Sequence, residues 1–95
     1  MPISSASNVQ YKQVTQVAAA TLKPTTGDFF GIVVISSTAG TVTVYNNTAA
    51  SGEIVFSRTA LVAGESFNFG GVGIRCGLGI HVVVGGTATV NALFQ

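Results

Sequence analysis

Hydrophobic and polar positions alternate along most of this chain with a period of two residues, which is typical of half-buried β-strands. Short stretches rich in Gly, Asn and Ser separate the alternating runs about every ten residues, a spacing found in sandwiches and barrels. The clearest runs are residues 41–45, 53–58, 66–69, 80–84 and 87–94. The pattern predicts an all-β fold, a single small antiparallel β-sandwich of about eight strands that is jelly-roll-like.

The remaining segments predict less regular elements. Residues 29–37 form the most apolar run, and hydrophobic side chains occupy both of its faces, so we expect a strand that is buried on both sides. Residues 9–17 are mostly polar and predict an edge strand. The alanine-rich stretch 18–22 predicts one helical turn, which Pro24 would end.

Glycine pairs and turns set the predicted connections. Ala39-Gly40 predicts a turn before residues 41–45, and Gly85-Gly86 predicts a hairpin, because glycines supply the positive φ angles of tight turns. Alternation then assigns one face of each strand to the core. The inward residues would be Phe30, Ile32, Val34, Val42, Val44, Ile54, Phe56, Phe67, Phe69, Ile80, Val82, Val84, Ala88, Val90, Ala92 and Phe94.

The length of 95 residues predicts a single domain. Residues 1–8 are small and polar without periodicity and predict a flexible N-terminal arm, whereas residues 9–95 form the sandwich. The arm lacks the basic start and apolar centre of a signal peptide, and the apolar runs are too short for a membrane helix. These features predict a protein that is made in the cytoplasm and does not bind a membrane.

Charged residues are scarce, at 7% of the chain, against about 25% in an average soluble domain. The net charge of +1, without a basic cluster, argues against binding to nucleic acid. Small free domains normally stay soluble through interspersed charges. We therefore expect part of the surface to be covered by copies of the chain or by another protein.

Apolar residues that fall opposite the inward sets are the candidates for such a contact. They are Phe29, Val33, Ile35, Val55, Val83 and Leu93, with Ile3 added from the arm. The alternative is that a β-bulge shifts the register by one residue and returns some of these side chains to the core.

The few reactive side chains do not form a recognisable catalytic set. The single cysteine, Cys76, and the single histidine, His81, would face opposite sides of the sheet, which argues against a nucleophilic pair. One cysteine and one histidine also provide neither an internal disulfide nor a zinc site. We expect Cys76 to be a small core residue.

The three carboxylates, Asp28, Glu53 and Glu65, all lie beside predicted turns, where they would form ordinary surface ion pairs rather than a calcium or acid–base site. The glycines between residues 70 and 79 do not have the spacing of a nucleotide-binding loop. The sequence thus predicts no enzyme, no metal and no cofactor. Exposed Tyr11 and Tyr45 leave open an alternative, a carbohydrate-binding module.

Two stretches, Gly40-Thr-Val-Thr-Val-Tyr-Asn-Asn-Thr-Ala-Ala-Ser-Gly-Glu-Ile-Val-Phe56 and Gly77-Leu-Gly-Ile-His-Val-Val-Val-Gly-Gly-Thr-Ala-Thr-Val-Asn-Ala-Leu-Phe-Gln95, resemble small β-sandwich structural proteins of tailed bacteriophages. The resemblance is strongest to the head decoration, or cement, type. It implies a homotrimer on the capsid surface of the virion that binds across junctions of the major capsid protein and stabilises the head. It implies no catalytic residue. A small tail or fibre component is the alternative within the same resemblance.

Overall fold

The computed structural model describes residues 9–15, 18–69 and 73–95, and every strand in them belongs to one antiparallel sheet. The all-β prediction is confirmed, with seven strands in the described residues. They are β1 (Gln10–Thr15), β2 (Ala18–Lys23), β3 (Gly27–Asn46), β4 (Glu53–Leu61), β5 (Ser66–Asn68), β6 (Ile74–Cys76) and β7 (Ile80–Phe94). The predicted arm, residues 1–8, lies outside the described residues.

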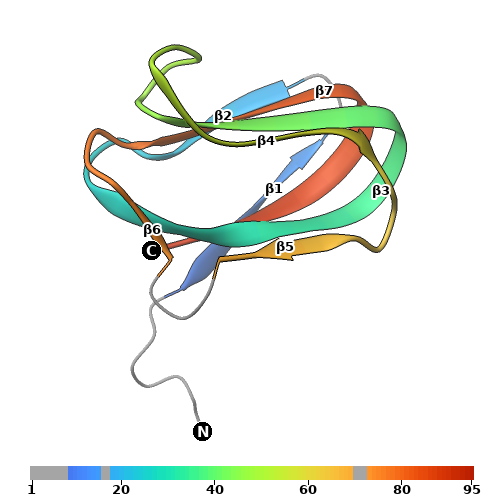
Figure 1. Cartoon of the computed structure of the whole chain (residues 1–95), viewed down its shortest axis with the longest axis horizontal. Coiled ribbons are helices and arrows are strands. Elements are labelled where there is room, and N and C mark those ends of the chain that lie inside the picture. Colours follow the sequence, from blue (N-terminus) through green and yellow to red (C-terminus); the bar gives the residue numbers. More distant parts are fainter. Residues whose placement is uncertain (1–8, 16–17, 70–72) are drawn as a thin grey trace, which may run out of the picture.

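Two long strands, β3 and β7, organise the sheet, because they pair with each other along most of their length. The strands β1 and β2 pair with the other side of β7, and β4, β5 and β6 pair with the other side of β3. The sheet bends across this long pair, so that its two halves face each other as the layers of a sandwich (Figure 1). We call them the β1 half, which also contains β5 and β6, and the β2 half, which also contains β4.

The bend lies at a tight corner where Ala39 and Gly40 of β3 meet Gly85 and Gly86 of β7. Between the pairs Thr38–Thr87 and Thr41–Gly85, two residues of β3 lie opposite a single residue of β7, which is Gly86. Gly86 has a φ of 67°, and a Cβ atom on it would overlap the carbonyl oxygen of Ala39. The predicted turn at Ala39-Gly40 and the predicted hairpin at Gly85-Gly86 are therefore wrong. Both glycine pairs bend strands that continue through them.

Local bulges decide which apolar side chains reach the core. The register of β3 shifts between Phe29 and Gly31, so Phe29 takes the buried position that alternation assigns to Phe30. A second shift, at residues 54–56 of β4, leaves Ile54 exposed although alternation places it inward. The wrong assignments follow from a single extra residue in each case.

The segment predicted as a helical turn is a strand instead. Residues Ala18 to Thr21 pair in register with Val84 to His81 of β7. Pairing with this central strand outweighs the helix propensity of alanine, which amounts to only a few tenths of a kcal/mol per residue. Strand β2 nevertheless ends just before Pro24, where the sequence predicted a stop.

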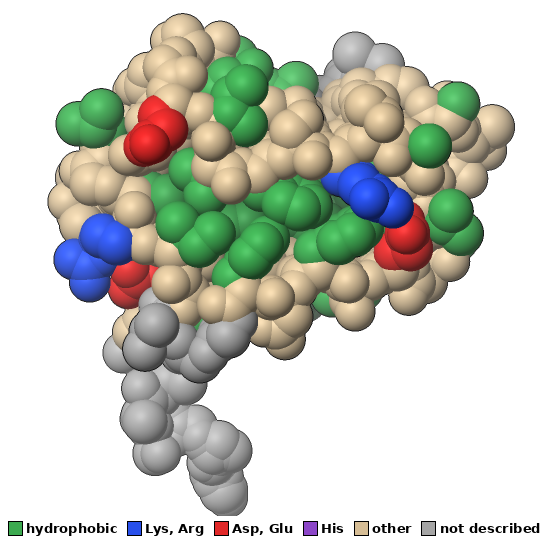
Figure 2. Space-filling model, viewed as in Figure 1, with side chains coloured by type: hydrophobic (Ala, Val, Ile, Leu, Met, Phe, Trp, Pro, Cys, Tyr) green, Lys and Arg blue, Asp and Glu red, His purple; other side chains and the backbone are tan. Residues whose placement is uncertain are grey.

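The two halves of the sheet are joined differently along their two edges. Strands β1 and β2 follow each other in the chain on one side. On the other side, β4 faces β5 and β6 across the core, and within the described residues β4 pairs with neither of them. Figure 2 looks directly onto this second edge. We call it the open edge.

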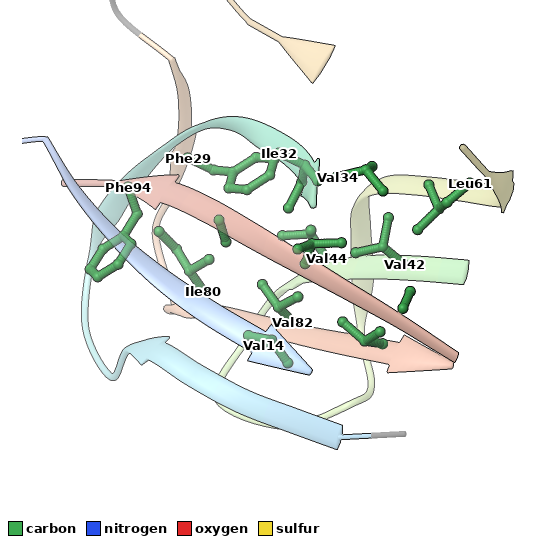
Figure 3. Packing of buried hydrophobic residues seen from close by; sticks show 14 of the residues in the cluster. Val14, Phe29, Ile32, Val34, Val42, Val44, Leu61, Ile80, Val82 and Phe94 are labelled. Carbon is green, nitrogen blue, oxygen red and sulfur yellow. The ribbon is translucent and has the colours of Figure 1, made fainter. Parts of the chain in front are cut away.

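Between the halves lies a single apolar core without a buried charged residue among the described positions. Alternate residues of β3 and β7 supply most of it, and they point toward one another from both layers (Figure 3). Its members are Val14, Phe29, Ile32, Val34, Val42, Val44, Leu61, Cys76, Ile80, Val82, Val84, Ala88, Val90, Ala92 and Phe94. The alternation predicted for residues 80–84 and 88–94 is confirmed throughout.

Candidate interaction surfaces

Among the described residues, the outer face of the β2 half carries no Asp, Glu, Lys or Arg. Residues paired across neighbouring strands point to the same side of a sheet. Two such rows define this surface, and we call it the Val83 face: Ala19, Val83, Thr43 and Ser57 in one row, and Thr21, His81, Tyr45 and Ile54 in the next. Ile54 is 54% exposed at its rim. The face thus combines aliphatic and hydroxyl side chains on four adjacent strands.

His81, the histidine of the Val83 face, is held by a local contact. Its Nδ1 atom lies 2.9 Å from the Oγ1 atom of Thr21, its paired neighbour on β2. The same hydroxyl also donates to the carbonyl of Thr48 at 3.3 Å, and therefore accepts from the imidazole N–H when it makes both bonds. The imidazole is thereby held by a hydroxyl that bears no charge.

The outer face of the β1 half is more polar. We call it the Leu93 face; its rows contain Tyr11, Leu93 and Asn68, then Gln13, Asn91, Val33 and Ser66. Asp28 and Arg75 close one end of it with an ion pair of 2.6 Å. Side-chain amides and this ion pair separate its apolar residues. The two outer faces of the sandwich therefore differ in chemistry.

The predicted contact residues are divided among three environments. Phe29 is fully buried, so its prediction as an exposed contact is wrong, because a bulge turns it inward. Val55 is partly buried and packs against the core, and its role in a contact stays a prediction. Val83 lies on one outer face, whereas Val33 and Leu93 lie on the other. Ile35 is 48% exposed beside a register shift near the corner. Ile3 falls outside the described residues, and the six apolar residues do not form one patch.

A third surface, which the sequence did not indicate, lies along the open edge. The rings of Phe56 from β4 and Phe67 from β5 pack with centroids 5.2 Å apart, and Phe69 lies 5.3 Å from Phe56. All three rings are only partly buried, and Figure 2 shows apolar side chains gathered in this region. We call the three residues the phenylalanine edge. The guanidinium of Arg58 lies 5.4 Å from the centre of the Phe67 ring.

The charged side chains lie at strand ends and edges. Arg58 forms an ion pair of 3.7 Å with Glu65 beside the phenylalanine edge. Glu53 accepts a hydrogen bond of 3.0 Å from the amide of Asn46. Asp28 and Glu65 thus form the predicted surface ion pairs, with Arg75 and Arg58, whereas Glu53 accepts its hydrogen bond from a neutral amide. No group of three His, Cys, Asp or Glu residues in the described part of the chain could hold a metal ion.

Cys76 and His81 do not approach each other as a catalytic pair would. Cys76 is fully buried on β6 and its Sγ atom lies 3.7 Å from the carbonyl of Ile74, whereas His81 points away from the core between buried Ile80 and Val82. Burial, with smaller contributions from Asp28 and Glu53, raises the pKa of the Cys76 thiol. The thiol form is therefore favoured, and a thiolate nucleophile is disfavoured.

Tyr11 and Tyr45 are also separated. Tyr11 is 68% exposed on the Leu93 face, and Tyr45 belongs to the Val83 face on the other layer of the sandwich. They do not form the shared stacking platform that a sugar-binding site built from both would need.

No protein-family model, curated protein sequence or solved structure matches this chain. No helix of the described residues is long and apolar enough to cross a membrane. The surfaces described above are thus the basis for any functional proposal.

Proposed function

We propose that this chain is a non-enzymatic structural protein of a bacteriophage virion, a capsid decoration protein that self-associates and stabilises the head. The observation that carries the self-association is the Val83 face, an uncharged surface that spans four strands. Interface centres are depleted of charged residues relative to the rest of a protein surface. Covering this face would remove apolar and hydroxyl surface from water without stripping water from a formal charge.

The virion assignment is supported by the resemblance of two stretches to phage decoration proteins. These stretches, residues 40–56 and 77–95, contribute adjacent strands of the Val83 face through β3, β4 and β7. The partners proposed are therefore copies of the same chain, in a trimer, and the major capsid protein. Repetition of a weak contact over a capsid lattice would raise the effective affinity.

A tail-associated or carbohydrate-binding module is the second candidate. Its support is Tyr11 alone, which is exposed on the Leu93 face beside amide side chains of Gln13 and Asn91. A single exposed ring would bury less of a bound sugar and orient it less well than a pair of rings would, so the assembly proposal is favoured.

Light scattering of the purified protein tests self-association. We expect a mass above that of the monomer, and we expect Val83→Lys to lower it, because it places an ammonium group in the centre of the Val83 face. Gln13→Lys is the matched control: it adds the same charge to the Leu93 face and should leave the mass unchanged. A monomeric wild-type protein, or equal masses for all three proteins, would contradict the proposal.

The virion assignment has its own test. Immunoelectron microscopy of the phage that encodes this chain should place the label on the head. Label on the tail, or on no part of the particle, would exclude a decoration role while leaving self-association intact.

A further inference from the structure

Strand β4 is the longest edge strand on the open side of the sandwich. It has nine residues, whereas β5 and β6 have three each. Its inner side pairs with β3, and no strand in the described part of the chain pairs with its outer side. An unpaired edge of this length exposes backbone N–H and C=O groups that another extended chain can bind.

The side of β4 that faces the core also presents apolar surface. Phe56 is only partly buried there, and it packs against Phe67 and Phe69 across the open edge. A chain that pairs with β4 would therefore cover both backbone groups and the phenylalanine edge. Removal of this apolar area from water would stabilise the contact.

The charges on β4 indicate which chain this is. Glu53 and Arg58 both lie on the core side of β4, because they pair with Asn46 and Val42 of β3. When two copies of β4 are placed antiparallel about a two-fold axis between Val55 and Phe56, Glu53 of each copy faces Arg58 of the partner subunit. The same register sets Ile54 opposite Ser57, and the two apolar residues at the axis opposite each other.

The remaining edge strands lack this self-complementarity. Among the described residues, β1 carries only Lys12, β2 only Lys23 and β6 only Arg75, and β5 has no charged residue. An antiparallel pair of any of these would bring no acid opposite a base. Arg58 also keeps about half of its side chain exposed beside Glu65, at 51%, so it is accessible to an additional carboxylate.

We propose that two copies of this chain associate about a two-fold axis along β4, covering the phenylalanine edge and forming two reciprocal Glu53–Arg58 ion pairs. This contact is distinct from the Val83 face and goes beyond the proposed function. A two-fold contact is complete once two copies have met. If the Val83 face forms a trimer, the β4 contact would join two trimers; otherwise it would join two single copies.

Charge reversal tests the register of this contact. Glu53→Arg would place Arg against Arg58 twice in the symmetric pair, and Arg58→Glu would place Glu against Glu53 twice. We expect either variant alone to scatter with about half the mass of the wild-type protein. An equimolar mixture of the two variants should regain the wild-type mass, because each variant then supplies the partner that the other lacks.

Controls separate this contact from folding and from the Val83 face. Lys12→Glu reverses a charge on the opposite edge of the sandwich and should leave the mass unchanged. Circular dichroism should show the β-sheet spectrum for all variants. Because Arg58→Glu also removes the ion pair with Glu65, regain of mass in the mixture, rather than loss in one variant, is the deciding result.

Two results would overturn the inference. One is an unchanged mass for Glu53→Arg and Arg58→Glu while Val83→Lys lowers it, which would leave the proposed function standing. The other is a loss of mass in both variants without recovery on mixing. Conversely, recovery of the wild-type mass on mixing, together with an unchanged mass for Val83→Lys, would support the two-fold contact and reject association through the Val83 face.

Discussion

The sandwich is closed in one way at its corner and in another way at its open edge. At the corner, β3 and β7 run continuously from one layer to the other, and Gly86 approaches the Ala39 backbone too closely for any larger residue. At the open edge, the layers meet through the side chains of Phe56, Phe67 and Phe69. Backbone geometry thus fixes the corner, whereas partly exposed rings close the open edge.

This difference indicates where the molecule has freedom to bind. A corner fixed by covalent connection and tight packing tolerates little change, because protein interiors are close-packed. An edge that is closed only by side chains retains unpaired backbone groups and apolar surface at β4. The proposed contacts lie on the second kind of surface, or on the outer Val83 face, and none of them lies at the corner.

Breaking the corner should have the largest effect on stability. Gly86→Ala places a Cβ atom against the carbonyl oxygen of Ala39 at a φ of 67°. We expect the free energy of unfolding in urea to fall by about 3 kcal/mol, from backbone strain and overpacking together.

The matched control for the corner is Gly77→Ala, since a Cβ atom there would meet nothing within 4 Å. Its free energy of unfolding should stay within about 0.5 kcal/mol of the wild-type value. All proteins are compared at one concentration, because association adds to apparent stability. Equal losses for both variants would show that the corner has no special constraint.

Loosening the open edge should cost less. Phe67→Ala removes a partly exposed ring that contacts Phe56 and Arg58. We expect a loss of about 1–2 kcal/mol in urea unfolding, below the 3–5 kcal/mol that is usual for deleting a fully buried Phe. Phe67→Leu keeps apolar volume and should lose less than Phe67→Ala. A loss as large as that of Gly86→Ala would mean that the corner and the open edge contribute equally to stability.

The sequence predicted the regular parts of the sheet better than the places where it bends. Alternation placed every core residue from Ile80 to Phe94 correctly, because β7 is a central strand with both neighbours paired over most of its length. The glycines in its middle have two interpretations. Gly-Gly suits both a hairpin and a bend, and only the partner strand decides between them.

Bulges limited the prediction of the interaction surface in the same way. One extra residue near Phe30 and one near Val55 exchange inward and outward positions. Gly31 lies beside the first bulge, and a glycine within a strand pattern is a signal for one. No glycine or proline marks the second, within residues 53–58. Scarcity of charge did anticipate an uncharged surface. It could not indicate which face, because the Val83 face combines residues from four strands whose pairing is set by the whole fold.

The smallest expected effect concerns Cys76, which is fully buried although it belongs to β6 beside the open edge. Burial raises its thiol pKa in the folded protein. The unfolded chain loses this proton above a pH of about 8.5 while the folded protein keeps it, so unfolding becomes easier as the pH rises. Below that pH both states hold the proton, and the group contributes no pH dependence.

We therefore expect the free energy of unfolding to decline above a pH of about 8.5, with a slope from this group of at most roughly 1.4 kcal/mol per pH unit. Urea titrations at increasing pH measure it, and Cys76→Ala should remove this component of the slope while lowering stability at every pH by loss of packing. Parallel profiles for the two proteins would mean that the folded thiol ionises as in the unfolded chain. The open edge would then admit water as far as Cys76, and side chains alone would not seal it.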